Sequence, residues 1–275
     1  MSIINTIIND DVIKGQKLIP DGLVTLTVTS PPYNVAAANW NYGVAADDQP
    51  YLEYIKWLKD IFTETYRITR KGGRLIINID AMTNRQDDKG EEYIRDIRTD
   101  LANILKPMGW KFFGEHVWYK SSLDPAHNGG QFNGKKTAWG SYMMPSLPAV
   151  RRNHEYILVY SKEQFKLEKN DDSKDPDITA KEFQNFIAST WSMNAETRNL
   201  GNHPVPFPED LPYRCIKLYS YPNDVVLDIF NGTGTTTAVA QKTKRRYIGI
   251  DMDKNYCVYA EERIAKQESM NIFGV

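Results

Sequence analysis

Apolar residues along the chain fall into short runs rich in β-branched side chains and into longer segments with helical spacing. The runs that predict strands are residues 3–8, 23–29, 74–79, 110–119, 155–160, 225–227 and 246–251. The segments that predict helices are residues 12–19, 51–69, 92–105, 211–219, 236–242 and 254–269. Strands that alternate with helices indicate an α/β fold with a mostly parallel, twisted sheet and helices on both faces.

Two stretches interrupt this alternation. Residues 121–153 are irregular, and residues 162–182 contain almost no apolar side chains but many Lys, Asp and Glu. The second stretch predicts an exposed excursion or a partly disordered loop, because it offers little apolar surface to bury. A chain of 275 residues fits one large α/β domain with an insertion, or two smaller domains.

The overall composition, with 41% hydrophobic and 25% charged residues, is ordinary for a soluble globular protein. No apolar run approaches the length of a membrane span, and the first residues lack the basic region of a signal peptide. The two cysteines, Cys215 and Cys257, have no partners at metal-ligand spacing, so neither a metal site nor a disulfide framework is predicted. We expect a cytoplasmic protein with no membrane association.

The distribution of charge is more informative than the net charge of −1. Residues 125–154 contain no Asp or Glu, but include Lys135, Lys136, Arg151 and Arg152. A solvated loop with chance charge is one interpretation. Aromatic and amide side chains mixed with these cations favour the other, a surface that faces nucleic-acid phosphates.

Polar side chains follow several of the predicted strands. Asp10 and Asp11 follow the first strand, Ser30 the second, and Asp228 and Asp251 end the last two. In open parallel sheets, ligands bind at the carboxyl ends of the strands. The pattern therefore predicts one polar site at that edge of the sheet.

The segment 228–236, Asp-Ile-Phe-Asn-Gly-Thr-Gly-Thr-Thr, joins a strand to a helix through a glycine turn. Backbone N–H groups converge at such a turn, which favours a nucleotide-like ligand. Asp251 follows about 20 residues later, where a carboxylate binds a ribose diol, or else caps the last helix. Asp228 would cap the turn or hold an ammonium group of the ligand. Asp11 would meet an adenine amino group, or be a plain loop aspartate.

A stiff turn, Ser30-Pro31-Pro32-Tyr33, follows the second buried strand. Each proline fixes its own φ and donates no N–H, so the turn presents carbonyl acceptors beside a hydroxyl and an aromatic ring. This set suits a planar group with an exocyclic amine, which would stack on Tyr33 and donate to Ser30 Oγ and to the Pro31 carbonyl. A merely rigid turn is the alternative.

The two motifs together resemble the DNA amino-methyltransferases, which use S-adenosylmethionine to methylate N4 of cytosine or N6 of adenine. Ser30–Tyr33 is similar to the catalytic motif of that family. The residues that match its cofactor loop are Asp228, Phe230, Gly232, Gly234, Thr235 and Thr236. The catalytic motif precedes the cofactor loop, which resembles the β group of the family and implies a target-recognition region between the two motifs.

The resemblance extends to other segments. His203, Pro204 and Phe207 lie in a stretch similar to the one that covers the methionine end of the cofactor, and Asp251 ends a strand similar to the ribose-binding one. The resemblance implies a Rossmann-like S-adenosylmethionine-dependent methyltransferase fold. Residues 1–120 and 203–275 would form the catalytic and cofactor-binding domain, and residues 121–202 the target-recognition region and exposed loop.

The implied function is site-specific methylation of a base flipped out of double-stranded DNA, within a restriction-modification system. Serine at position 30 resembles the cytosine-N4 form of the catalytic motif, which favours cytosine over adenine. The alternatives are an adenine-N6 enzyme of the same architecture, a methyltransferase of RNA or of a protein amide, and a dinucleotide-dependent oxidoreductase or DNA-binding module. A cognate restriction endonuclease and a second copy of the chain are the expected protein partners.

Overall fold

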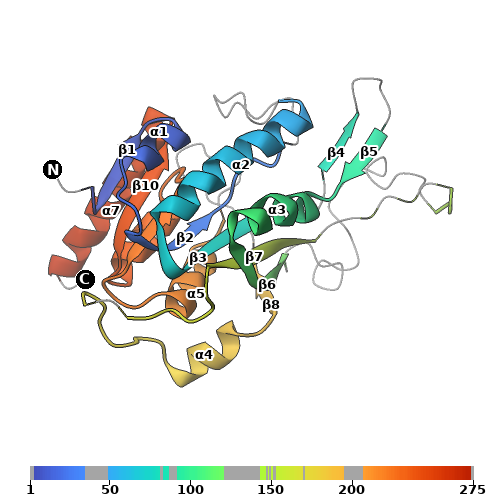
Figure 1. Cartoon of the computed structure of the whole chain (residues 1–275). Coiled ribbons are helices and arrows are strands. Elements are labelled where there is room, and N and C mark those ends of the chain that lie inside the picture. Colours follow the sequence, from blue (N-terminus) through green and yellow to red (C-terminus); the bar gives the residue numbers. More distant parts are fainter. Residues whose placement is uncertain are drawn as a thin grey trace.

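The computed structural model describes residues 3–34, 49–80, 83–86, 92–120, 143–146, 148, 150, 153–169, 171–194 and 207–273. Its centre is an eight-stranded sheet with the strand order β1-β10-β9-β2-β3-β7-β6-β8 (Figure 1). The strands are β1 (Thr6–Asn9), β2 (Val24–Thr29), β3 (Thr69–Ile79), β6 (Trp110–Lys120), β7 (His154–Lys162), β8 (Thr190–Met193), β9 (Val225–Asp228) and β10 (Arg246–Asp251).

The sheet is parallel over its first five strands and mixed at its other end. Strands β1, β10, β9, β2 and β3 pair parallel to one another. Strand β7 pairs antiparallel to β3, β6 antiparallel to β7, and β8 parallel to β6. The mostly parallel sheet predicted from the sequence is confirmed. Strands β7 and β8 belong to this sheet, although they come from within residues 121–202.

Helices pack on both faces of the sheet and divide the core in two. The helices are α1 (Val12–Lys17), α2 (Tyr51–Ile68), α3 (Ile97–Leu105), α4 (Ala180–Phe186), α5 (Asp210–Tyr219), α6 (Thr235–Lys242) and α7 (Lys254–Phe273), with a 3-10 turn η2 (Lys106–Met108). Residues of α1, α2 and α3 fill one core layer, and residues of α5, α6 and α7 fill the other. Among the described helices, none is long and apolar enough to cross a membrane.

The predicted helix over 92–105 is wrong in its first part. Residues Glu92–Arg95 form strand β5, which pairs antiparallel with β4 (Thr83–Gln86) in a hairpin apart from the main sheet (Figure 1). Helix α3 begins only at Ile97, because Asp96 is its N-cap and accepts a hydrogen bond from Thr99 N–H at 3.3 Å. The capping aspartate was the sequence signal for the later start.

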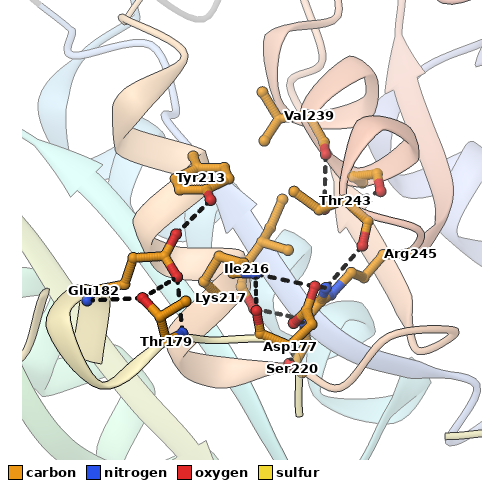
Figure 2. A network of polar contacts seen from close by, with 11 residues as sticks. Asp177, Thr179, Glu182, Tyr213, Ile216, Lys217, Ser220, Val239, Thr243 and Arg245 are labelled. Carbon is orange, nitrogen blue, oxygen red and sulfur yellow. Dashed lines mark hydrogen bonds and ion pairs between the residues drawn. The ribbon is translucent and has the colours of Figure 1, made fainter. Parts of the chain in front are cut away.

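The charged stretch after β7 is anchored at defined points. We call residues 163–169 and 171–187 the strap; it leads through α4, below the sheet in Figure 1, toward β8. Figure 2 shows its contacts with α5 and with the turn after α6. Asp177 accepts two hydrogen bonds from the Arg245 guanidinium at 2.6 and 2.9 Å, and Glu182 accepts one from the Tyr213 hydroxyl at 2.7 Å. The strap is largely exposed, as an exposed excursion would be, and two of its carboxylates bond to groups on the folded domain.

We expect Asp177→Ala to lower the free energy of unfolding by about 2 kcal/mol, because the Arg245 side chain is fully buried and would lose its carboxylate. The loss stays moderate, since Arg245 keeps the Ser220 and Thr243 carbonyls as acceptors. Urea denaturation measures it. Asp175→Ala is the matched control from the same strap, because among the described residues Asp175 pairs with Lys169 alone, at the surface, and its loss should be neutral. Equal stability of the two variants would contradict an anchoring role for Asp177.

Candidate active site

The carboxyl ends of β1, β10, β9 and β2 lie along one edge of the sheet and bring the predicted polar residues together. In the parallel register, Asn9 pairs with Asp251 and Gly249 with Asp228. The Thr29 hydroxyl, just before the Pro-Pro turn, donates to Asp228 Oδ1 at 2.8 Å. The residue just before the catalytic motif and the first residue of the cofactor loop, about 200 residues apart in sequence, are therefore joined by a buried hydrogen bond.

The glycine turn adopts a conformation that only small residues tolerate. Gly232 has a φ of 48° and Gly234 a φ of 78°, both in the left-handed region. A Cβ atom on Gly234 would lie 2.6 Å from the Cβ of Ala260 on α7, so the turn packs tightly against that helix. Helix α6 begins at Thr235, and within the described residues no side chain caps its N-terminus. Its first N–H groups are therefore suited to an external acceptor.

Two carboxylates border this turn, one buried (Asp228) and one half-buried (Asp251). Asp228 is 1% exposed, and burial raises its pKa to about 6, although the Thr29 hydroxyl and the Phe230 N–H donate to Oδ1. Asp251 Oδ2 accepts from the Gly232 N–H at 2.7 Å, and burial raises the pKa of Asp251 as well. A site that holds two carboxylates against their desolvation cost favours a cationic or hydroxyl-bearing ligand.

The aspartates near the strand ends differ in their hydrogen-bond partners. Asp253, rather than Asp251, accepts from the N–H groups of Asn255 and Tyr256 at the start of α7. Asp11 is the N-cap of α1 and accepts from the second and third residues of that helix at 3.0 and 3.1 Å. The structure thus gives Asp11 a capping role, and leaves Asp251 beside the glycine turn.

Helix α2 supports the site from one side. Its Tyr54 is fully buried, and the Tyr54 hydroxyl donates to the Pro32 carbonyl at 2.6 Å, which fixes the Pro-Pro turn against α2. The Trp57 ring lies 5.7 Å, centroid to centroid, from the ring of Phe230 in the cofactor loop. Both motifs are therefore held by one helix whose site contacts the sequence pattern did not reveal.

A polar cluster that was not predicted surrounds Tyr33. The Tyr33 hydroxyl lies 3.0 Å from Ser30 Oγ and donates to Glu155 Oε2 at 3.1 Å. Asn78 Nδ2 donates to the same carboxylate oxygen at 2.9 Å, and the Lys120 ammonium pairs with the other oxygen. Burial raises the pKa of Tyr33, and the negative charge of Glu155 raises it further, so Tyr33 stays a donor at neutral pH.

This cluster comes from β3, β6 and β7, which meet at the same edge of the sheet. Strand β7 is antiparallel to β3, so its beginning, with Glu155, lies at the end of β3 where Asn78 is found. Lys120 ends β6, and Glu155 pairs with Trp118 of that strand. Parallel strands bring their carboxyl ends to this edge, whereas the antiparallel strand β7 brings its amino end, so the strand-end pattern in the sequence did not include Glu155.

Several predicted residues lie outside the described residues, namely His203, Pro204, Lys135, Lys136, Arg151 and Arg152. Phe207 is described: it is partly buried and packs against the core layer of α5 and α6. Thr235 Oγ1 accepts from the Arg263 guanidinium at 3.1 Å, and Thr236 is fully buried. The cofactor-loop threonines thus lie within the packed start of α6.

The geometry can now be compared with known proteins. The sequence model of the DNA methylase family, of the N6 and N4 type, matches residues 24–262, which include both motifs. This chain belongs to the DNA methylase family. The amino-methyltransferase resemblance seen in the two motifs is confirmed, and so is the cofactor of the family, S-adenosyl-L-methionine.

Relatives of this DNA methylase include the Type II methyltransferase M.MjaVI of Methanocaldococcus jannaschii, 31% identical over 70% of this chain and 87% of the relative. M.MthZI of Methanothermobacter thermautotrophicus is 29% identical over 90% of this chain and 72% of the relative. A DNA modification methylase of Thermus thermophilus, solved with S-adenosyl-L-methionine, has a TM-score of 0.73 at 24% identity, covering 96% of this chain and 94% of that one. The cytosine-N4-specific PvuII DNA methyltransferase has a TM-score of 0.67 at 17% identity, covering 98% and 90%. These likenesses confirm the Rossmann-like fold of the DNA methylase.

Proposed function

We propose that this DNA methylase transfers a methyl group to the exocyclic N4 amine of a cytosine flipped out of double-stranded DNA, at a specific sequence, in a Type II restriction-modification system. The observation that carries the proposal is the turn Ser30–Tyr33, joined to the cofactor loop through the Thr29–Asp228 hydrogen bond. Type II methyltransferases among the relatives support the biological setting. A cognate restriction endonuclease and a second copy of this chain are the proposed protein partners.

The polar groups at the glycine turn fit S-adenosyl-L-methionine. It carries a ribose diol, an amino acid group with an ammonium, and a carboxylate. We propose that Asp251 binds the diol and that Asp228 lies toward the ammonium, because a half-buried and a fully buried carboxylate lie beside the turn. The uncapped start of α6 suits a carboxylate. When bound, the cofactor supplies a methyl group already activated by its sulfonium, so this chain needs only to bind and orient.

The Pro-Pro turn supplies the acceptors for the base. The exocyclic amine is a weak nucleophile because its lone pair is delocalised into the ring. Hydrogen bonds from the amine to Ser30 Oγ and to the Pro31 carbonyl would localise that lone pair on nitrogen and orient it. A base within the duplex cannot reach these acceptors, so it must flip out at a cost of a few kcal/mol, which stacking on Tyr33 offsets in part.

Adenine-N6 methylation is the second candidate, because an N6 amine offers the same two N–H donors to the same acceptors. Serine at position 30, which resembles the cytosine-N4 form of the motif, favours cytosine. Digestion of the methylated DNA to nucleosides, followed by mass spectrometry, distinguishes N4-methylcytosine from N6-methyladenine. We expect N4-methylcytosine; N6-methyladenine alone would overturn the choice of base. Label transferred to RNA or protein, but not to duplex DNA, would overturn the choice of substrate.

We expect Asp251→Ala to weaken the binding of S-adenosyl-L-methionine by roughly 1–3 kcal/mol, about 5- to 150-fold in Kd, because ribose hydroxyls would lose their acceptor. Calorimetry measures the affinity. Asp253→Ala is the control, since Asp253 is two residues away and bonds instead to the start of α7. Equal affinities of wild type and Asp251→Ala would show that the diol is bound elsewhere.

We further propose that Lys135, Lys136, Arg151 and Arg152 contact DNA phosphates within the target-recognition region. Replacing all four with glutamine should weaken DNA binding and flatten its dependence on salt, with a slope reduced by about 0.9 for each phosphate that is no longer neutralised. Binding measured between about 50 and 200 mM salt gives the slope. An unchanged slope would remove these four residues from the interface.

A further inference from the structure

We propose that Glu155 is a positioning residue for methyl transfer. It fixes the direction of the hydrogen-bond chain that runs through Tyr33 to Ser30, so that the free side of Ser30 Oγ can only accept a hydrogen bond. The inference rests on the proposed function, in which Ser30 accepts from the target amine. It adds a residue on the antiparallel strand β7 to a site otherwise built from the ends of parallel strands.

The direction of the hydrogen-bond chain follows from Glu155, the residue at its end. An ionised carboxylate has only acceptors, so the Tyr33 hydroxyl must donate to Glu155 Oε2, at 3.1 Å. A tyrosine hydroxyl has one hydrogen, and with that hydrogen committed its oxygen accepts. The Ser30 hydroxyl, 3.0 Å away, is therefore the donor in the Ser30–Tyr33 contact.

The surroundings of Glu155 keep its carboxylate an acceptor. The residue is 6% exposed, and two further donors face it: Asn78 Nδ2 at 2.9 Å from Oε2, and the Lys120 ammonium at Oε1. An ammonium has no acceptor and compensates the buried negative charge. Reversing the chain would require a donor at the position of Glu155 Oε2, which a carboxylate paired in this way does not provide.

The direction matters because of what the target amine offers. Its two N–H groups need acceptors, and its lone pair must remain available for the methyl group. With its only hydrogen given to Tyr33, Ser30 Oγ presents lone pairs alone. A reversed chain would direct the Ser30 hydrogen outward, where it would leave an N–H without an acceptor and compete for the nucleophilic lone pair.

The substitution Glu155→Gln tests the direction with almost no change in shape. The Lys120 ammonium selects the amide oxygen, which places the amide NH₂ at the position of Oε2, facing Tyr33. The Asn78 amide, which donates to Oε2 in the wild type, must then turn over so that its oxygen accepts from this NH₂. The NH₂ group donates to Tyr33, Tyr33 donates to Ser30, and the chain is reversed. We expect the single-turnover rate of methyl transfer to fall about 10- to 100-fold. The affinity for S-adenosyl-L-methionine should stay unchanged, because Glu155 contacts the Pro-Pro turn and not the glycine turn.

Tyr33→Phe, alone and combined with Glu155→Gln, separates this role from a structural one. Tyr33→Phe cuts the chain and leaves the Ser30 hydroxyl free to rotate, so we expect a loss of a few-fold, smaller than that of Glu155→Gln. In the Tyr33→Phe background, Glu155→Gln should have no further effect on the rate, because no chain remains to reverse. If Glu155 only stabilised the fold, Glu155→Gln would lower the rate by the same factor in both backgrounds, and that result would overturn the proposal.

Glu115→Gln is the matched control, since Glu115 lies on β6, faces β7 in the same pair of strands, pairs with Arg98 and has no contact with Tyr33. It should leave the rate unchanged.

Thermal unfolding of each variant reports whether it is folded. If Glu155→Gln does not fold, Tyr33→Phe still tests the proposal, because a wild-type rate in that variant would show that the hydrogen-bond chain through Tyr33 has no role in methyl transfer. The proposed function fails separately, if the wild-type protein methylates no base in duplex DNA. Transfer to adenine N6 would correct the base but leave this test intact, since both amines donate.

Discussion

Replacing Ser30 with alanine is expected to lower the rate of methyl transfer about a hundredfold, the cost typical of removing one preorganised polar contact from a reacting group. Binding of S-adenosyl-L-methionine should change little, because Ser30 lies at the end of β2 and contacts Tyr33, not the glycine turn. Single-turnover transfer of labelled methyl groups to duplex DNA, at saturating cofactor, measures the rate without product release.

Ser189→Ala is the control for this substitution, because Ser189 is exposed and lies before β8, away from the site. It should be as active as the wild type. A rate for Ser30→Ala within about twofold of the wild type would mean that the amine finds its acceptor elsewhere, and the Pro31 carbonyl alone would then be the acceptor in the proposal. A rate lowered together with cofactor affinity would instead indicate a disturbed turn.

The inner strands of the parallel half of the sheet were predictable because they are buried on both faces. Strands β2 and β9 therefore appear as short runs rich in β-branched and aliphatic residues, and their ends are marked by the polar groups that line the site. Once the strand order placed β9 beside β2, Ser30 and Asp228 had to lie close together. The predicted part of the site thus followed from local patterns and one general rule about where parallel sheets bind ligands.

The rest depended on contacts that no local pattern records. Glu155 joins the site because β7 runs antiparallel to β3, and the sequence of a strand does not state its direction. The strap is largely exposed, in agreement with an exposed excursion, but its anchoring could not be predicted because its partners, such as Arg245 for Asp177, are about 70 residues away along the chain. Charged residues far apart in sequence have the same composition whether they are solvated or paired, so only the fold distinguishes the two.

Asp228→Asn is expected to make the cofactor-free protein more stable at neutral pH, by up to about 3 kcal/mol. The folded protein holds the pKa of Asp228 at about 6, against an ordinary value of 3.8, and each unit of difference corresponds to about 1.4 kcal/mol. Between these two values the unfolded chain has released its proton and the folded chain has not, so stability falls as pH rises from about 4 to about 6. Asparagine keeps the Oδ1 acceptor for the Thr29 hydroxyl and the Phe230 N–H. It replaces the charged Oδ2 by an NH₂ group, for which the nearby Thr236 hydroxyl can turn to accept.

Urea denaturation of the cofactor-free wild type and of Asp228→Asn, at several pH values between about 4 and 8, gives the difference directly. We expect the two to be equally stable near pH 4, and the variant to gain steadily up to pH 6 or 7. Asp96→Asn is the control, because asparagine also caps a helix and Asp96 is exposed. The gain should be accompanied by weaker binding of S-adenosyl-L-methionine, since a buried carboxylate that destabilises the empty protein is kept for a cationic ligand. If the stability of the two proteins changed with pH in the same way, burial would not disfavour the charged form of Asp228. The proposal that Asp228 lies toward the ammonium group of the cofactor would then be wrong.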